Sequence, residues 1–147
     1  MGKEISCGEL SKEVSALEHI CHFANCYGRF DYHLSREENE ARYRAEEKAI
    51  AEKINQALLD GGKIYEITFG REVGIVTVQG NHVDNLYIEG EYQMNGFGTK
   101  LLAYALSVAG STAYIDVPKS NEIMRHICDK LGLIKTDETA YTIRMSK

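Results

Sequence analysis

Residues 93–102 read Gln-Met-Asn-Gly-Phe-Gly-Thr-Lys-Leu-Leu, and they join two apolar segments of different periodicity. The run from Val83 to Ile88 before them predicts a strand. The residues after them predict a helix ending at Gly110, with apolar side chains at helical spacing at Leu101, Leu102, Ala105, Leu106 and Ala109. The first amides of such a helix lack internal partners, its dipole favours negative charge, and glycines let a ligand approach the backbone. We therefore predict an anion site at Gln93–Thr99, of the kind that holds a pyrophosphate.

The glycine spacing argues against two common phosphate-binding motifs. The dinucleotide fingerprint requires a third glycine three residues after Gly98, where this chain has Leu101, and the P-loop sequence Gly-Lys-Ser/Thr is absent. What remains is Gln-x-x-Gly-x-Gly, and here the chain resembles the GNAT superfamily of N-acetyltransferases. In that family the signature Gln/Arg-x-x-Gly-x-Gly/Ala follows the fourth strand and wraps the pyrophosphate of acetyl-CoA. A second family motif, an asparagine followed by a helix and Gly-Phe, is similar to Asn121, Lys130, Gly132 and Leu133.

Composition and charge limit the class of protein. With 147 residues, 44% of them hydrophobic and 27% charged, the chain is typical of one soluble globular domain. A net charge of −5 does not supply the basic surface on which nucleic-acid binding depends. No apolar run reaches the roughly 18 residues that span a membrane, and the N-terminus lacks the apolar core of an export signal. The four cysteines are then expected to be reduced thiols, and the expected location is the cytoplasm.

The periodicity along the chain predicts a mixed α/β sheet of six or seven strands with about four helices. Helices are expected at Ser11–Ala24, Arg36–Leu59, Leu101–Ala109 and, with Ser120 as a possible N-cap, Asn121–Leu131. Strands are expected near Ile5 and at Lys63–Phe69, Val73–Val78, Val83–Ile88 and Ala113–Val117. A last hairpin should join Leu133–Lys135 to Tyr141–Met145 around Asp137 and Glu138. The resulting order, β-α-α-β-β-β-α-β-α-β-β, is also the element order of GNAT proteins.

The resemblance implies how a cosubstrate would bind. In the GNAT fold the fourth and fifth strands separate and acetyl-CoA enters between them. Its pantetheine would pair with main-chain groups of Leu86, Tyr87 and Ile88, where an exposed N–H would polarise the thioester carbonyl. Asn121 would face the cosubstrate. The pyrophosphate would lie on the signature residues Gln93, Met94, Asn95, Gly96, Phe97, Gly98 and Thr99.

The resemblance also indicates candidate proton-transfer groups. In several GNAT proteins the base lies on the fourth strand at positions that correspond to His82 and Asp84. These residues are two apart and would share a face of a regular strand. A histidine titrates in the useful pH range, although His82 could equally be an exposed residue after a tight turn. Where the family often has a tyrosine that protonates the leaving thiolate, this chain has Cys128, which could donate a proton or simply fill the core.

The acceptor site and a metal site remain open alternatives at this stage. Acceptor specificity in the fold usually comes from the loop between the first two helices, here with Tyr27, Phe30 and Tyr32, aided by His33 and by Asp137 and Glu138 of the last hairpin. Aromatic and carboxylate groups suit an amine, but they equally suit a packed loop or a dimer contact. The cluster His19, Cys21, His22 and Cys26 has zinc-ligand chemistry without a second pair, so helix packing is the preferred interpretation and no metal is expected.

The function predicted from these observations is an acetyl-CoA-dependent N-acetyltransferase. An amine acceptor, small or on a peptide, would attack the thioester directly in a ternary complex. The alternative is a non-catalytic acyl-CoA-binding or interaction module that keeps the pyrophosphate site and has lost the proton-transfer groups, as Cys128 at the tyrosine position allows. A third interpretation is a metal-binding regulatory protein. No nucleic-acid or membrane partner is expected, and a homodimer is consistent with the family.

Overall fold

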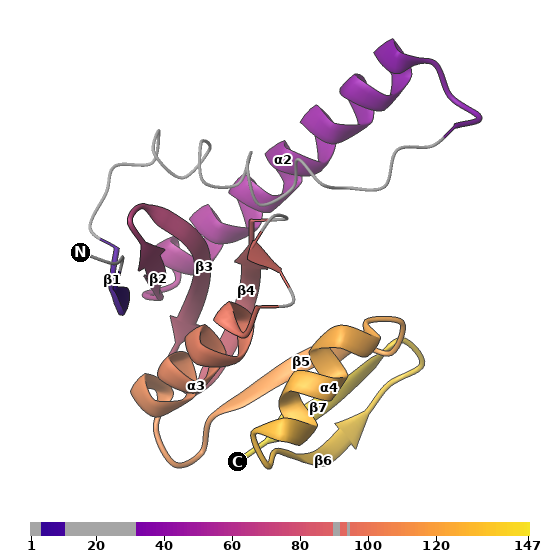
Figure 1. The fold of residues 1–147 in the computed structure, drawn as a ribbon. Coiled ribbons are helices and arrows are strands. Elements are labelled where there is room, and N and C mark those ends of the chain that lie inside the picture. Colours follow the sequence, from indigo (N-terminus) through magenta and orange to yellow (C-terminus); the bar gives the residue numbers. More distant parts are fainter. Residues whose placement is uncertain (1–3, 11–31, 90–91, 94) are drawn as a thin grey trace.

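A computed structural model describes residues 4–10, 32–89, 92–93 and 95–147. Seven strands form one sheet in the order β1-β2-β3-β4-β5-β7-β6 (Figure 1). All neighbouring strands are antiparallel except β4 and β5, which are parallel. The strands are β1 (Ile5–Glu9), β2 (Lys63–Phe69), β3 (Glu72–Gln79), β4 (His82–Ile88), β5 (Tyr114–Pro118), β6 (Ile134–Glu138) and β7 (Thr142–Ser146). The helices among the described residues are α2 (Arg36–Leu59), α3 (Phe97–Ala109) and α4 (Glu122–Lys130).

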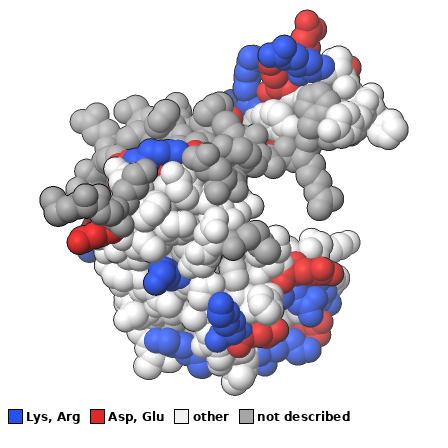
Figure 2. Space-filling view, viewed as in Figure 1, with Lys and Arg blue, Asp and Glu red and all other residues white. Residues whose placement is uncertain are grey.

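The helices cover both faces of the sheet (Figure 1). Helix α3 contacts β2, β3 and β4, and its buried side chains join those of the sheet and of α4 in the main hydrophobic core. Helix α2 packs on the opposite face, where Ala51 and Ile54 meet Ile64 and Ile75 in a smaller cluster. The first half of α2 projects beyond the sheet, and Figure 2 shows charged side chains of both signs gathered there.

Local signals define α2 at both ends. Ser35 is its N-cap: the Ser35 hydroxyl accepts a hydrogen bond from the Glu38 N–H at 3.1 Å, and the Glu38 carboxylate accepts one from the Ser35 N–H at 3.3 Å. This reciprocal arrangement satisfies two backbone donors that a helix start leaves without partners. After the helix, Gly61 adopts a φ of +90°, which reverses the chain into β2.

The structure confirms the predicted fold class, and most predicted element bounds lie within one residue of the observed ones, although α3 begins at Phe97 and not at Leu101. The predicted ranges of α2 and β2 are found unchanged, and the first-strand prediction at Ile5 corresponds to β1. The helix predicted at Ser11–Ala24 lies outside the described residues.

Two predictions for the C-terminal part of the chain were wrong. Asn121 rather than Ser120 caps α4, because its side-chain oxygen accepts a hydrogen bond from the Met124 N–H at 3.1 Å. Asp137 and Glu138 belong to β6, so the hairpin turns at residues 139–141. Every residue of β6 is exposed, and a strand without a buried face lacks the alternation that reveals strands in a sequence.

Gly74 provides a test of how closely β3, β2 and β4 are packed. A Cβ atom at this position would overlap the Ile88 side chain and would lie 3.0 Å from both Ile67 Cγ2 and the Tyr87 carbonyl oxygen. We expect Gly74→Ala to lower the free energy of unfolding by about 1–3 kcal/mol, the usual cost of overpacking a core. Urea denaturation followed by circular dichroism would measure it.

Gly8 in β1 is the matched control, because a Cβ there would have no neighbour within 4 Å. Gly8→Ala should leave the unfolding free energy within about 0.5 kcal/mol of the parent protein. Equal effects of the two substitutions would mean that the close approach at Gly74 does not limit the packing.

Candidate functional site

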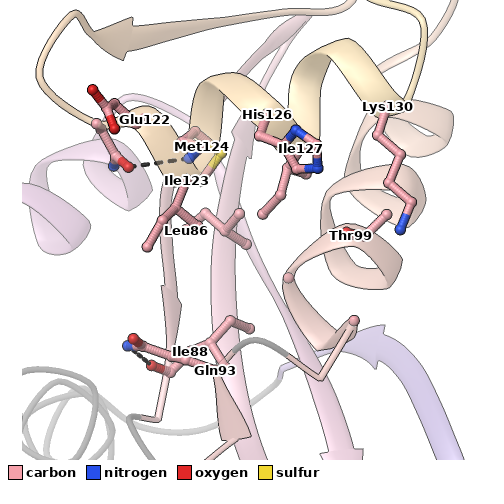
Figure 3. Close-up of a pocket in the computed structure, with 13 residues that line it drawn as sticks. Leu86, Ile88, Gln93, Thr99, Glu122, Ile123, Met124, His126, Ile127 and Lys130 are labelled. Atoms are coloured by element: carbon pink, nitrogen blue, oxygen red, sulfur yellow. Dashed lines mark hydrogen bonds between the residues drawn. The ribbon is translucent and has the colours of Figure 1, made fainter.

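A large pocket of about 520 Å³ lies between β4, the start of α3 and the inner side of α4 (Figure 3). Leu86 and Ile88 form its β4 wall, while Gly96, Gly98 and Thr99 form the wall at the start of α3. Residues of α4 and its N-cap supply the remaining wall: Asn121, Glu122, Ile123, Met124, His126, Ile127 and Lys130. The pocket therefore combines apolar side chains with the open backbone of a helix N-terminus.

The two signature glycines have different physical roles. Gly96 is the N-cap of α3 and adopts a φ of +83°, which a residue with a side chain would reach only with strain. It offers no side-chain cap, and the first turn of α3 carries no acidic residue, so the first amides of the helix are left for a ligand. A Cβ at Gly98 would touch Ile127 Cδ1 at 3.4 Å and Ile88 Cγ1 at 3.7 Å, so this glycine keeps the backbone exposed to the pocket.

Gln93 and Asn95 shape the turn before α3. The Gln93 side-chain amide donates a hydrogen bond to the Ile88 carbonyl at 2.9 Å, drawn as a dashed line in Figure 3. The Asn95 side-chain amide donates one to the Gln93 carbonyl at 3.2 Å. In this arrangement the Gln93 side chain links the turn to the end of β4. Met94, which was also predicted to contact the pyrophosphate, lies outside the described residues.

An ion pair and aromatic rings brace the same turn from the other side. Glu89, buried directly after β4, lies 2.6 Å from the Arg71 guanidinium, and its N–H donates to the Val73 carbonyl at 2.8 Å. Arg71 also lies over the Tyr92 ring at 5.6 Å. Tyr92 in turn packs edge-on against Phe97, the first residue of α3, with 5.6 Å between ring centroids. These contacts fix the position at which α3 begins.

β4 and β5 pair through only two residues each. His82 lies opposite Tyr114 and Val83 opposite Ile115, and beyond these pairs the strands have no further register. The register between β3 and β4 shifts in the same place, since Thr77 pairs with Asp84 whereas Ile75 pairs with Tyr87. Asn85 lies at this irregularity and is the one residue other than glycine with a positive φ, +53°, among those described.

Hydrogen bonds hold Asn85 in its left-handed conformation. Its N–H donates to the Asp84 carboxylate at 2.7 Å, and its side-chain amide donates to the Thr77 hydroxyl at 3.0 Å. The Thr77 hydroxyl donates to the Asp84 carbonyl at 3.0 Å. Asparagine tolerates this region of backbone conformation better than other residues with side chains. The result is a bulge that the three polar side chains stabilise together.

The bulge decides which face of the sheet each candidate residue occupies. On a regular strand His82, Asp84, Leu86 and Ile88 would share one face. Instead Leu86 and Ile88 line the large pocket, while His82 and Asp84 line a smaller pocket of about 160 Å³ beside α2. Tyr87 packs against the α2 cluster. The two candidate bases thus share a face with each other, and that face is opposite the large pocket.

His82 belongs to a stacked group of polar side chains. Its ring is parallel to that of Tyr114, with 4.7 Å between centroids, and the Arg144 guanidinium lies 4.2 Å from the centre of the Tyr114 ring. Asp116 accepts two hydrogen bonds from Arg144, at 2.9 and 3.2 Å, and its carboxylate lies 3.8 Å from His82 Nε2. The Asp116 carboxylate raises the pKa of Arg144. The group extends across β4, β5 and β7 where β4 and β5 separate.

Cys128 is fully buried in the main core and does not line the large pocket. Burial, and then the charge of Asp129, raise the pKa of its thiol to about 11. The thiol is protonated at neutral pH but is enclosed by packed side chains. Its placement is that of a small core residue, the second of the two roles that the sequence left open.

Asn121 lines the large pocket and also serves as the N-cap of α4, where its side-chain oxygen accepts a hydrogen bond from the Met124 N–H. The sequence named Lys130 as part of the second family motif but did not assign it to the pocket. It did not single out the other pocket residues of α4, which are Glu122, Ile123, Met124, His126 and Ile127. The available signal was the spacing of Met124, Ile127 and Lys130, which places them along one side of a helix that begins at Asn121.

The predicted acceptor residues are only partly described. Tyr27 and Phe30 lie outside the described residues, as do the four residues of the alternative zinc cluster. Tyr32 precedes the N-cap of α2 and its side chain is 88% exposed. Glu138 forms ion pairs with Lys119 at 2.9 Å and Lys135 at 3.3 Å, which lower its pKa. Among the described residues no three His, Cys, Asp or Glu side chains gather as a metal site would require.

Comparison with solved structures shows that the chain has the GNAT fold. It is similar to the PaiA N-acetyltransferase of Thermoplasma acidophilum in complex with coenzyme A, with 17% identity, a TM-score of 0.68 and 98% of each chain covered. A spermidine N-acetyltransferase chimera from Vibrio cholerae and hSSAT superposes with 15% identity and a TM-score of 0.64, over 97% of this chain and 93% of the other.

A third structure is the putative acetyltransferase yncA of Salmonella typhimurium with acetyl-CoA, at 13% identity and a TM-score of 0.62, over 97% of this chain and 92% of the other. No protein-family model matches the chain. No curated protein matches it in sequence. Within the described part of the chain, no helix has both the length and the apolar character needed to cross a membrane.

The bulge at Asn85 leads to a stability test. Asn85→Gly keeps the left-handed conformation without strain but loses the hydrogen bond to Thr77. We expect it to lower the free energy of unfolding by about 1 kcal/mol. Asn85→Val loses the same hydrogen bond and adds a β-branched side chain at positive φ, so it should cost about 2 kcal/mol more. Urea unfolding of both variants gives the comparison, and equal losses would show that backbone strain at Asn85 is not what the asparagine relieves.

Proposed function

We propose that this protein is an acetyl-CoA-dependent N-acetyltransferase that moves an acetyl group to an amine in a ternary complex. The observation that carries the proposal is the large pocket, in which the uncapped start of α3 and the apolar wall of β4 converge beside the separation of β4 and β5. The GNAT fold of the chain supports it, because two of the similar structures named above hold coenzyme A or acetyl-CoA.

The residues present fit acetyl-CoA. The amides at Gly96–Thr99 can donate to a pyrophosphate at a helix N-terminus, and the missing side chain of Gly98 leaves room for it. The apolar side chains of Leu86, Ile88 and Ile127 suit the pantetheine arm. The main chain of β4 beyond the bulge would polarise the thioester carbonyl, since it no longer pairs with β5. Bound acetyl-CoA supplies the activated acyl group as a thioester.

The reaction requires two proton transfers. The acceptor nitrogen forms a bond to the carbonyl carbon and loses one proton, while the carbon–sulfur bond breaks and the thiolate takes up one proton. We propose that the amine approaches from the face of α2, where His82 and Asp84 lie at the point of strand separation and can accept its proton, directly or through water. The burial of Cys128 argues against a role for its thiol, so we assign the second proton to water or to another residue.

The alternative function is a GNAT-fold module that binds an acyl-CoA without turnover. One observation favours it: Cys128 occupies the position of the family's tyrosine and is enclosed in the core. Turnover of acetyl-CoA with any member of a broad amine panel would decide in favour of the enzyme. In either case we propose a cytoplasmic protein, consistent with a homodimer, whose acceptor would be a small amine or a peptide amine.

Ligand-induced stabilisation tests the pyrophosphate site. Acetyl-CoA at about 100 times its dissociation constant should stabilise the protein by about 2.7 kcal/mol, which corresponds to a rise in Tm of about 5–10 °C. Gly96→Glu should abolish the rise, because a carboxylate would then occupy the anion site. Differential scanning fluorimetry with and without millimolar acetyl-CoA measures both effects.

Gly61→Glu is the matched control for Gly96→Glu. Gly61 has a similar φ of +90° and open surroundings, so the substitution imposes the same backbone strain away from the pocket. Its Tm should fall by a similar amount while the rise with acetyl-CoA is retained. The absence of a rise in the parent protein at millimolar acetyl-CoA would remove the basis for the proposed function.

The role of His82 can be separated from its packing against Tyr114. His82→Ala removes both the imidazole and the stack, whereas His82→Phe keeps a ring against Tyr114 and cannot accept a proton. Both variants should lower kcat by about a hundredfold, the usual scale of general base catalysis, with the Kd for CoA unchanged within about twofold. Full activity of His82→Phe would instead assign His82 a packing role. Steady-state kinetics and calorimetry provide the two readouts.

A further inference from the structure

Two basic side chains point from α4 into the large pocket. His126 and Lys130 are four residues apart and therefore lie on the same side of the helix. Both residues are exposed, and both line the pocket. Figure 3 shows the Lys130 side chain extending from α4 toward the first turn of α3, the element that carries Thr99 and the unpartnered amides.

The pairing of charges distinguishes Lys130 from neighbouring cations. Arg144 is bound to Asp116, whereas Lys119 and Lys135 are both bound to Glu138. Within the described residues Lys130 makes neither an ion pair nor a hydrogen bond, although it lies in a pocket. A surface lysine without a partner is common, but one that faces a ligand pocket beside a helix N-terminus places a second positive group where an anion is already favoured.

The two ends of the pocket also carry side chains of opposite charge. Glu122 lines it at the opposite end of α4, eight residues before Lys130, which corresponds to about 12 Å along the helix axis. Figure 3 shows the two side chains at opposite ends of the pocket. An elongated ligand with its anionic groups at one end would therefore be oriented with that end toward Lys130 and the start of α3.

We infer that Lys130, aided by an N–H of His126, recognises the 3′-phosphate of coenzyme A and makes the pocket select CoA over dephospho-CoA. This inference rests on the proposed function, since it takes CoA as the ligand. Coenzyme A carries two separate anionic groups, a pyrophosphate and a phosphate on the attached ribose. The α3 amides can hold the first, and the unpaired ammonium beside that helix turn is the group placed to hold the second.

The experiment compares two ligands and four proteins by isothermal titration calorimetry. The parent protein, Lys130→Gln, His126→Ala and a control variant are titrated with CoA and with dephospho-CoA. The parent should bind CoA about tenfold more tightly, as one charge-assisted contact at an exposed site allows. Lys130→Gln should lose that tenfold preference, with its Kd for dephospho-CoA unchanged within about twofold. His126→Ala should reduce the preference by about threefold.

Lys100→Gln is the matched control because it makes the same change of charge on α3. The charge of Lys100 acts on Cys7 of β1, so its ammonium lies toward the other end of the sheet from α4, and it does not line the pocket. The CoA preference should persist in this variant. If Lys100→Gln loses as much of the preference for CoA as Lys130→Gln, the net charge of the protein, and not contact with Lys130, produces that preference. This result would overturn the inference.

The remaining outcomes separate this inference from the proposed function. Equal affinity of the parent for CoA and dephospho-CoA would overturn the inference and leave the proposed function standing. A similar loss of affinity for both ligands in Lys130→Gln would also overturn it, since Lys130 would then act on the pyrophosphate or on the fold. Failure of the parent to bind either ligand would overturn both. Raising the salt concentration should reduce the preference of the parent but not change the ratio measured for Lys130→Gln.

Discussion

The hydrogen bonds around Asn85 determine the shape of the site. The Asp84 carboxylate and the Thr77 hydroxyl together hold one residue of β4 in a left-handed conformation. Because a strand alternates its side chains, one such residue moves everything after it to the other face. Leu86 and Ile88 consequently face the pocket beside α3 and α4, whereas His82 and Asp84 face α2. The same bulge coincides with the end of pairing between β4 and β5.

The two faces of the sheet carry different kinds of chemical groups. The α3 and α4 face supplies an apolar wall, backbone amides and the Lys130 ammonium, which has no ion pair among the described residues, and these groups suit a long ligand with an anionic end. The opposite face supplies carboxylates, the His82–Tyr114 stack and the paired Arg144. In the proposed function, the acetyl donor would bind on the α3 and α4 face and the amine acceptor would approach from the face of α2.

Polar groups near the site are mostly satisfied by the protein itself. Gln93 is bound to the Ile88 carbonyl, Glu89 to Arg71, and Asn121 to the first turn of α4. Side chains that hydrogen-bond to the protein's own backbone fix the turn geometry and the helix starts. The polar groups that remain for a ligand include the first turn of α3 and Lys130. Because these groups are already ordered, ligand binding loses little free energy to the ordering of side chains.

The sequence alone determined the features that depend on short-range rules. The bounds of α2 and β2 follow from helix-capping residues, glycines and apolar periodicity. The Gln-x-x-Gly-x-Gly segment identified the strand, turn and helix that form two walls of the pocket. The strand predicted at Leu133–Lys135 ended three residues too early compared with β6, because none of the residues of β6 is buried. The tertiary structure decided which face each candidate side chain occupies, since one hydrogen-bonded residue, Asn85, inverts the alternation of β4. It also placed Cys128 in the core and Lys130 in the pocket, because burial and pairing depend on elements that are distant in the sequence.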